Sequence, residues 1–433
     1  MSAPSGVAPG RVQAIPLEDR LAAQNFLLEH LRRGGAPSSL PVPTAADWDC
    51  MVEESIRHRI APLAYRRLAD GPWGAMMPAA TRERLRSIHV RNAFRNAILL
   101  RETAQAVEAL ASAGVPTMLL KGVHLAGFVY DEPALRSMAD IDVMVPRSKL
   151  EVAERVFLDQ GYGPLPRPDL AAHCAWSNHL PRLEKPDAEV LEVHFSIERP
   201  TAPFDIDIDA LWARARAVRV GGLQAWALCD EDLLLHLCLH ASYHHRFDRY
   251  ALKGLLDVST LIGRCAATLD WDDVAATANA WRAGGFVYCT LRLVRDILGA
   301  QVPAAVLSAL AHDAADDEVT AVAARYILTP SVDLPEAVLD MRRRRGLGER
   351  LLLFVRGVFL PREQLRRMYG LRPGSPLVPG LYVVRLFDLL RRRGGIMLRT
   401  LFRAQSVEPT LERENDRQEI ERWATRVGAR TAA

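Results

Sequence analysis

The spacing of apolar residues changes twice along this chain, and that change constrains the fold most strongly. From about residue 17 to 113, apolar side chains recur every three or four positions, which predicts amphipathic helices. Short apolar runs of strand length follow as far as about residue 208, and helical spacing then returns. The sequence therefore predicts an α+β fold, in which a small α/β core with a mixed sheet is embedded in a largely helical chain.

Glycine, proline and serine mark the predicted boundaries. Gly114 and Pro116 close the last helix before the core, and one core helix is expected to start at a Ser148 cap and to end at Gly161. The predicted segments are a disordered lead-in (1–15), an N-terminal helical region (16–113), the α/β core (114–208), a helical domain (209–335) and a basic C-terminal helical region (336–433).

Acidic side chains lie on two of the predicted core strands. Asp140 and Asp142 open a very apolar strand and face the same side, because side chains alternate along a strand. Glu192 and His194 share one face of a later strand for the same reason. Carboxylates on neighbouring strands can hold a pair of divalent ions, and hard oxygen ligands suit Mg²⁺ or Mn²⁺. We therefore interpret Asp140, Asp142 and Glu192 as metal ligands and catalytic carboxylates.

Basic and small residues beside these strands fit a phosphate. Gly122 follows the first strand, where a glycine lets the backbone approach a phosphate chain. Lys121 or Arg136 could neutralise phosphate charge, and Arg136 could do so through two parallel hydrogen bonds. Ser137 follows Arg136 in the same motif. A second acidic repeat, Asp205 to Asp209, is instead interpreted as a loop and a helix cap.

These motifs resemble those of the nucleotidyltransferase superfamily. The segment from Leu119 to Ile197 is most similar to a bacterial subgroup with LKG, R…DID and a later acid-x-His strand. The resemblance implies metal ligation by Asp140 and Asp142, with a third carboxylate at Glu192, where relatives more often have aspartate. Many members carry Gly-Ser where this chain has Lys121-Gly122, so the resemblance implies a different triphosphate contact here. We expect Lys121, Gly122, Arg136, Ser137 and His194 to bind the nucleotide.

Three histidines of the helical domain, His236, His240 and His244, share one helix face because of their i, i+4, i+8 spacing. They could line the cleft or help to bind a metal ion, or they could form a polar seam against the core. For His194, direct participation in the site and a structural role that supports the site residues from behind are equally well supported.

Lys253 and Asp257 are four positions apart on an apolar helix. An ordinary ion pair between them is favoured, and the alternative places Lys253 on the cleft wall against a phosphate.

Charge and composition limit the partners. Residues 342–403 hold 16 arginines and three acidic residues, which raises the prospect of RNA or another polyanion as a partner. Packed helices and an anionic membrane surface are the other interpretations of this segment. No apolar run is long enough to span a membrane, and the six scattered cysteines favour reduced thiols in a cytoplasm.

The sequence thus predicts a Mg²⁺-dependent nucleotidyltransferase. It would move a nucleoside monophosphate from an NTP, which we expect to be ATP, to an acceptor. Two classes of acceptor are open: a small molecule or peptide, and a macromolecule, either RNA or protein. The alternative is a catalytically degenerate module on the same fold that binds a nucleotide or a partner protein.

Overall fold

The computed structural model of the protein describes residues 27–29, 31, 43–71, 74–163, 169–248, 250–311, 314–329, 362, 380–384 and 408–432. The chain divides into two compact units, Met1–Leu328 with Glu419–Ala433, and Thr329–Gln418. The predicted lead-in (1–15) and nearly all of the arginine-rich segment (342–403) lie outside the described residues. The elements discussed below belong to the first unit, except that the last helix, α19 (Glu408–Ala432), begins in the second.

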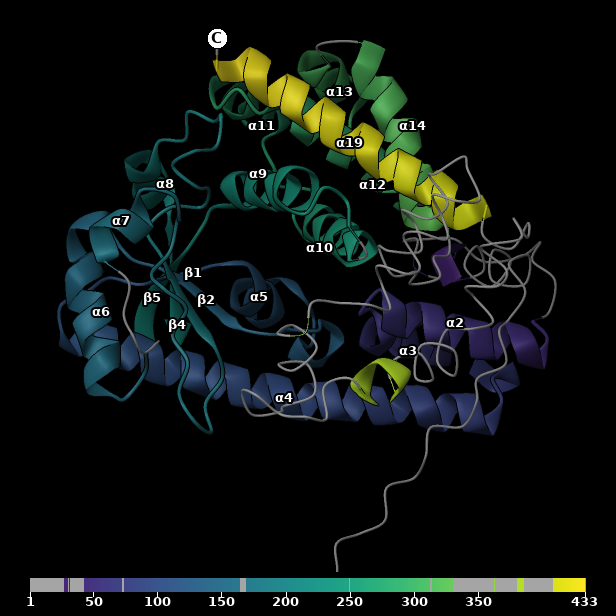
Figure 1. The fold of residues 1–433 in the computed structure, drawn as a ribbon, viewed down its shortest axis with the longest axis horizontal. Coiled ribbons are helices and arrows are strands. Elements are labelled where there is room, and N and C mark those ends of the chain that lie inside the picture. The colour runs from purple at the N-terminus through teal and green to yellow at the C-terminus, as the bar shows by residue number, and fades with distance from the viewer. Residues whose placement is uncertain are drawn as a thin grey trace, which may run out of the picture. The chain divides into compact units, whose positions relative to one another are not determined.

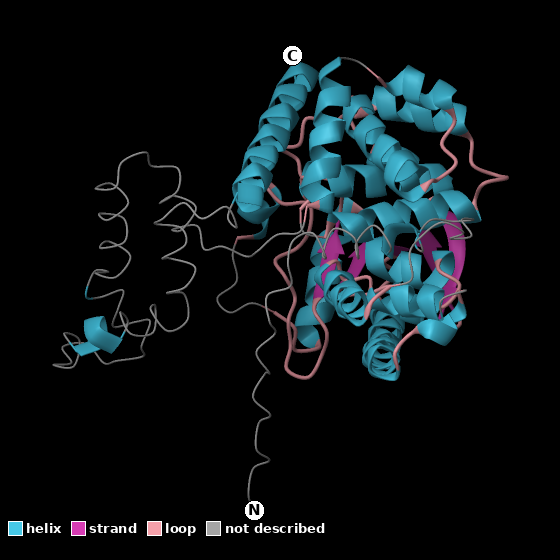
Figure 2. Ribbon diagram, turned by 90° about the vertical axis from the view of Figure 1, so that its right-hand side faces the viewer, coloured by secondary structure: helices cyan, strands magenta, loops and turns pink. Residues whose placement is uncertain are grey.

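A mixed five-stranded sheet lies among the helices of this unit (Figure 2). Its strand order is β3-β2-β1-β5-β4. β1 pairs antiparallel with β2 and parallel with β5, β2 pairs parallel with β3, and β4 pairs antiparallel with β5. This sheet among many helices confirms the predicted α+β fold. The strands are β1 (Met118–Leu119), β2 (Ile141–Met144), β3 (Leu191–His194), β4 (Arg216–Val220) and β5 (Leu223–Ala227).

Two of these strands lie where helices were expected. The sequence predicts a helical domain over residues 209–335, whereas β4 and β5 form a hairpin that completes the sheet. Gly221 and Gly222 join the two strands with φ values of 59° and 85°. Two consecutive positive φ angles are what a tight type I′ hairpin turn requires, so the Gly-Gly pair was the overlooked signal.

Short helices connect the strands. α5 (Lys121–His124) follows β1 and continues as a π-helical turn, Leu125–Val129. α6 (Leu150–Asp159) follows β2, and Gly161, with φ 84°, lies just beyond its end as predicted. The predicted Ser148 cap is wrong, because a 3₁₀ turn over Arg147–Lys149 precedes the helix and no side chain caps it.

The N-terminal helices confirm the helical spacing of that region. α2 (Ala45–Arg57) starts with a capping box made by Thr44 and Asp47, and α3 (Ala61–Asp70) has proline in its first turn. α4 (Ala79–Ser112) is 34 residues long, and it runs beneath α3 at one end and beneath the sheet at the other (Figure 1).

Helices from the second half of the chain cover the other side of the core (Figure 1). α9 (Asp230–Leu239) and α10 (Ala251–Arg264) lie opposite β2 and α5 (Figure 1). His236 lies on α9, His240 and His244 lie in the π-helical turn that follows it, and Lys253 lies on α10. Other helices that the structure describes in this unit are α7 (Leu170–Cys174), α8 (Ile208–Arg214), α11 (Trp271–Ala280), α12 (Gly284–Leu298), α13 (Ala304–Leu310) and α14 (Ala314–Leu328). Asp207 caps α8 by accepting from the Ala210 N–H at 3.0 Å, as predicted.

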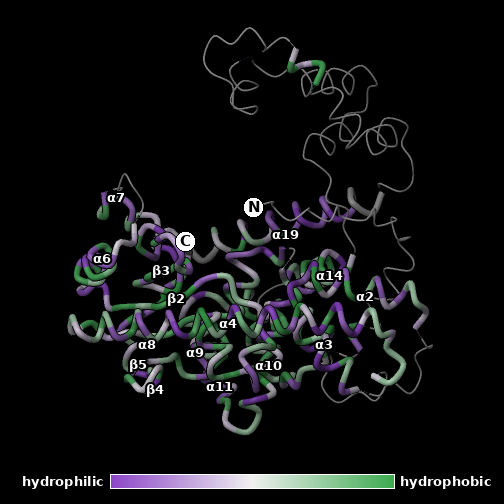
Figure 3. The backbone as a smooth tube through the Cα atoms, turned by 90° about the horizontal axis from the view of Figure 1, so that it is seen from below, coloured by the Kyte–Doolittle hydropathy of each residue, from purple (hydrophilic) through white to green (hydrophobic). Residues whose placement is uncertain are grey.

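The last helix, α19 (Glu408–Ala432), is mostly hydrophilic (Figure 3). Its apolar residues near the end are nevertheless buried: Ile420 and Trp423 are 0% and 1% exposed. The Trp423 ring meets that of Phe286 at 4.9 Å, and its Nε1 donates to Asp316 Oδ1 at 3.1 Å. Within the described residues, no helix is long and apolar enough to cross a membrane.

Candidate nucleotide and metal site

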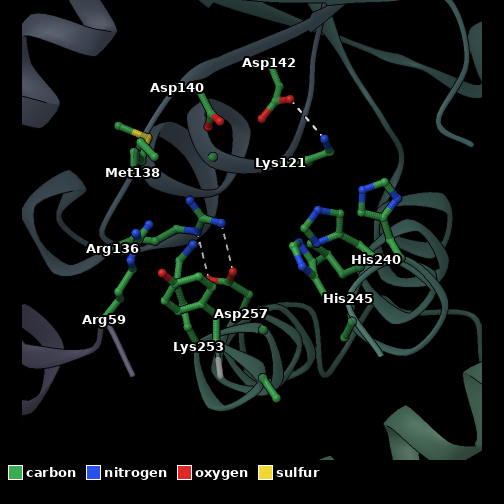
Figure 4. A pocket seen from close by; sticks show the side chains of 18 of the residues that line it. Arg59, Lys121, Arg136, Met138, Asp140, Asp142, His240, His245, Lys253 and Asp257 are labelled. Carbon is green, nitrogen blue, oxygen red and sulfur yellow. Dashed lines mark hydrogen bonds and ion pairs between the residues drawn. The ribbon is translucent and has the colours of Figure 1, made fainter. Parts of the chain in front are cut away.

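A cavity of about 300 Å³ lies between the predicted carboxylates and helices α9 and α10 (Figure 4). This volume is at the lower end of the range for small-molecule sites. Six of the predicted site residues line it: Lys121, Gly122, Arg136, Asp140, Asp142 and Glu192. Side chains far apart in the sequence therefore meet in one place.

Asp142 is the most constrained of the carboxylates. It lies on β2 directly beside Glu192 on β3 and is 4% exposed. Lys121 Nζ donates to its Oδ1 at 3.0 Å, and His194 Nε2 lies 2.9 Å from the same oxygen. Burial alone would raise the pKa of Asp142, but the charge of Lys121 and the hydrogen bond with His194 hold it well below its usual range. Asp142 is therefore ionised, and both contacts leave Oδ2 to other partners.

Asp140 and Glu192 flank Asp142 and are half-buried. Burial raises the pKa of each carboxyl, and the negative charge of Asp142 raises it further. A bound cation reduces the repulsion between carboxylates that lie this close together, so the residues present fit a divalent metal ion.

Among the described residues, one cluster of possible ligands lies within 4.8 Å, and it consists of Asp142, Glu192 and His194. Asp140 lines the same cavity but stands outside this cluster.

His194 lies behind the carboxylates and does not line the cavity. It is 2% exposed, and burial, followed by the charge of Lys121, lowers its pKa to about 4. Its Nδ1 lies 3.4 Å from Asn178 Nδ2. A neutral imidazole held in this way fixes the direction of the Asp142 carboxylate.

Lys121 and Gly122 bring the backbone close to the cavity. Lys121 has φ 38°, a left-handed backbone conformation that residues other than Gly, Asn and Asp rarely adopt. A Cβ on Gly122 would come within 3.2 Å of Arg136 Nη1 and 3.5 Å of the Met138 side chain. The glycine therefore allows these groups to approach each other.

Arg136 is anchored by a carboxylate of the helical domain. Its Nε and Nη2 each donate to Asp257 at 2.9 Å, and the Tyr130 hydroxyl donates to the same carboxylate at 2.8 Å. Asp257 thus forms its ion pair with Arg136 and not with Lys253, which lines the cavity separately. Ser137 does not line the main cavity, and it lies on a small neighbouring one beside Arg136.

The long helix α4 holds the segment that leads into β2. Asn96 Nδ2 donates to the carbonyl oxygens of Pro133 and Arg136 at 2.6 and 2.7 Å. One turn earlier, Asn92 Nδ2 donates to the carbonyl of Ala134 at 2.7 Å. The same helix also reaches the segment before β3, because Glu102 accepts from the Glu189 N–H at 2.8 Å. The approaches to both acidic strands are therefore attached to α4.

Histidines form the wall opposite the carboxylates. His240 and His244 lie in a π-helical turn after α9 and stack at 5.4 Å, and His245 meets His240 at 4.4 Å. All three line the cavity. Burial, then the charge of Lys121, lowers the pKa of His240 well below its usual value, while burial and His245 lower that of His244 to about 4. His240 and His244 are therefore neutral near pH 7. His236 is buried behind this wall, and within the described residues neither of its ring nitrogens has a hydrogen-bond partner.

The comparisons with known proteins agree with this geometry. A family model described as "Uncharacterised nucleotidyltransferase" matches residues 44–299. The chain belongs to this nucleotidyltransferase family. No curated protein and no solved structure matches it. The matched segment contains every residue that lines the cavity, from Arg59 to Asp257.

Several residues that line the cavity were not predicted from the sequence. Arg59 comes from the end of α2, and Tyr250 and Asp248 come from the loop before α10. His245 follows the predicted histidine series and could have been found from it. The position of Arg59 at the cavity could not be predicted from the local sequence, because polar residues are common at the end of a helix.

Proposed function

We propose that this protein transfers a nucleoside monophosphate from an NTP to an acceptor hydroxyl or phosphate. We expect the NTP to be ATP. The acceptor oxygen bonds to the α-phosphorus, the bond to the bridging α–β oxygen breaks, and pyrophosphate leaves. The observation that carries this proposal is the carboxylate group at the cavity: Asp142 is ionised, and burial and its charge raise the pKa of both Asp140 and Glu192. Family membership supports the same class of reaction.

Asp140, Asp142 and Glu192 would hold Mg²⁺ or Mn²⁺. Bound divalent ions of this kind neutralise charge on the attacking and leaving oxygens. The chain itself would position the reactants: Lys121 and His194 orient Asp142, and Gly122 admits the phosphate chain. Arg136, with Ser137 beside it, would add positive charge from a fixed position, because Asp257 anchors its side chain. One of the three carboxylates would accept the acceptor's proton.

Two classes of acceptor fit the proposal. A small molecule or peptide would enter the cavity beside the carboxylates, where the neutral side chains of His240 and His244 offer hydrogen-bonding groups without charge. RNA or protein would use a surface outside the cavity, and the arginine-rich segment 342–403 is the candidate for RNA. Binding of RNA through that segment would weaken steeply with added salt. We place the reaction in the cytoplasm.

Calorimetric titration with ATP, GTP, CTP and UTP in the presence of Mg²⁺ tests the proposal. The wild-type protein is compared with Asp140→Ala/Asp142→Ala, in which two carboxylates of the cavity are removed. The matched control is Asp205→Ala/Asp209→Ala, which removes two exposed carboxylates of the second acidic repeat. We expect metal-dependent binding of at least one NTP by the wild type and the control, and none by the cavity variant.

Pyrophosphate release from the NTP that binds then separates the enzyme from the alternative. Slow release with water as the acceptor, lost in the cavity variant, supports transfer. Metal-dependent binding without release in any acceptor mixture supports a catalytically degenerate module. A folded wild-type protein that binds no NTP with Mg²⁺ or Mn²⁺ contradicts the proposal.

A further inference from the structure

Two cations at one end of the cavity have no acidic partner. Lys121 is paired with Asp142 and Arg136 with Asp257, whereas Arg59 and Lys253 make no ion pair within the part of the chain that the structure describes. Both line the cavity, on the side away from Asp142 (Figure 4). They come from separate elements, the end of α2 and helix α10. Positive charge supplied by two elements to one cavity suits an anionic ligand.

Arg59 occupies a backbone position that normally belongs to glycine. The Ile60 N–H donates to Ser55 O at 2.8 Å and the Arg59 N–H to Ile56 O at 2.9 Å, which is the Schellman pattern at a helix C-terminus. Arg59 is the left-handed residue of that motif, with φ 57°. A side chain in this conformation is strained, and such strain is often retained where the side chain has a function.

An aromatic ring holds the Arg59 guanidinium in place. Its carbon lies 4.2 Å from the centroid of the Tyr250 ring, and Tyr250 also lines the cavity. A guanidinium stacked on a ring keeps its N–H donors in one plane and free to point outward. The position is therefore organised before any ligand binds.

Lys253 lies among charges of both signs. Arg136 and Arg59 repel its ammonium, while Asp257 and Asp140 attract it. Burial, followed by the charge of Arg136, lowers the pKa of Lys253 to about 8. A bound anion would favour the charged ammonium and would remove the repulsion from Arg59.

We propose that Arg59 and Lys253 bind the β- and γ-phosphates of the donor NTP, and so the pyrophosphate that leaves. The inference rests on the proposed function, in which the α-phosphate lies at the carboxylates. The triphosphate tail then needs cations that are not already paired with protein carboxylates. Arg59 and Lys253 meet that need, and phosphate is the ligand that a planar guanidinium and an ammonium bind together.

Calorimetric binding of ATP, ADP, AMP and inorganic pyrophosphate at fixed free Mg²⁺ tests this assignment. Arg59→Gly removes the guanidinium at a position where glycine relieves strain, so the variant should fold at least as well as the wild type. Lys253→Met removes the ammonium and keeps most of the apolar stem. Arg91→Gln and Lys149→Met remove exposed cations away from the cavity and serve as matched controls.

We expect each cavity variant to weaken binding of ATP and of pyrophosphate about tenfold or more, because each loses a charged hydrogen bond. AMP binding should stay within about twofold of the wild type, since AMP lacks the tail. The urea midpoint of Arg59→Gly should lie at or above that of the wild type. Bound pyrophosphate should also cause proton uptake above pH 8, and this uptake should be absent in Lys253→Met.

Other outcomes overturn the assignment. If Arg59→Gly and Lys253→Met leave the affinities for ATP and pyrophosphate unchanged, the two cations do not bind the triphosphate tail. They would then bind a phosphate of the acceptor, or no ligand. Equal losses for AMP and ATP would indicate general damage to the cavity. If the wild type binds no NTP, the proposed function fails, and the pyrophosphate titration alone decides whether Arg59 and Lys253 form an anion site.

Discussion

Arg136 and Asp257, 121 positions apart in the chain, form a bidentate ion pair in which both hydrogen bonds measure 2.9 Å. Both side chains are buried, at 7% and 3% exposure. The pair joins the segment before β2 to helix α10, and so it fixes the two walls of the cavity with respect to each other.

Removing one partner of this pair should destabilise the protein strongly. Asp257→Ala leaves the Arg136 charge buried without compensation, which typically costs about 3–5 kcal/mol. Arg136→Met/Asp257→Leu removes both charges and should recover much of that loss. Urea unfolding of the single and double variants measures the difference. A loss below about 1 kcal/mol for the single variant would show that water or Tyr130 replaces the carboxylate.

The attachment of the cavity to α4 gives a second prediction. Asn96→Ala removes two short hydrogen bonds to the segment that carries Arg136 and should cost about 1–3 kcal/mol. The two carbonyls keep only longer bonds, from the Arg136 N–H at 3.4 Å and from Asn92 Nδ2 at 3.3 Å. NTP affinity should fall as well, because Arg136 and Asp140 lose their support. Asn279→Ala is the control, since that exposed side chain also donates to a distant carbonyl, at 3.2 Å. Equal effects of the two substitutions on NTP affinity would argue against the supporting role of α4.

A buried carboxyl outside the cavity predicts how stability depends on pH. Burial raises the pKa of Glu198 to about 7, and in the part of the chain that the structure describes its Oε2 has no hydrogen-bond partner. Because the folded pKa lies above the unfolded value of 4.5, the folded state retains this proton as the pH rises from about 4.5 to 7, and stability falls across that range.

Glu198→Gln removes the ionisation and should therefore be more stable than the wild type at pH 8, by about 1–3 kcal/mol. Near pH 4.5 the two proteins should be equally stable. Urea unfolding at a series of pH values between 4.5 and 8 provides the measurement. A constant difference across the series would mean that the effect is steric and not electrostatic.

The close approach at Gly122 gives a further prediction. Gly122→Ala places a methyl group 3.2 Å from Arg136 Nη1, so the guanidinium must shift. Stability should change by less than about 1 kcal/mol, since alanine is favoured in a helix. NTP affinity should fall about fivefold, by calorimetry. Gly127→Ala is the control, because a methyl there meets nothing nearer than a Leu100 carbon at 4.0 Å. An unchanged affinity in Gly122→Ala would show that the phosphate chain does not pass this glycine.

The strands and their facing side chains could be predicted because they depend on local alternation. Period two places Asp140 with Asp142 and Glu192 with His194, and parallel pairing of β2 with β3 then brings Asp142 next to Glu192. The helices at α9 and α10 followed equally from local spacing. The hairpin of β4 and β5 had a local signal in Gly221-Gly222, but its parallel pairing with β1 is a long-range choice that spacing does not encode.

The partners of the charged side chains could not be predicted from spacing. Asp257 is four residues from Lys253, which suggested a helical ion pair, yet the structure places the distant Arg136 on it. A buried guanidinium gains two hydrogen bonds from that carboxylate, whereas an i, i+4 pair contributes only a few tenths of a kcal/mol. Arg59 enters the cavity because α2 and α10 pack around the same core, and such packing lies beyond any local pattern.

Lys121 and Lys253 both line the cavity, although the chain has only four lysines among 55 basic residues. The other two, Lys149 and Lys185, lie outside it. Reagents that acylate amines but not guanidinium groups can therefore modify only a few side chains of this protein, and two of its four lysines line the cavity. Protection of Lys253 from acylation, measured by peptide mass, would report occupancy of the cavity by any metabolite in an extract, before the acceptor is known.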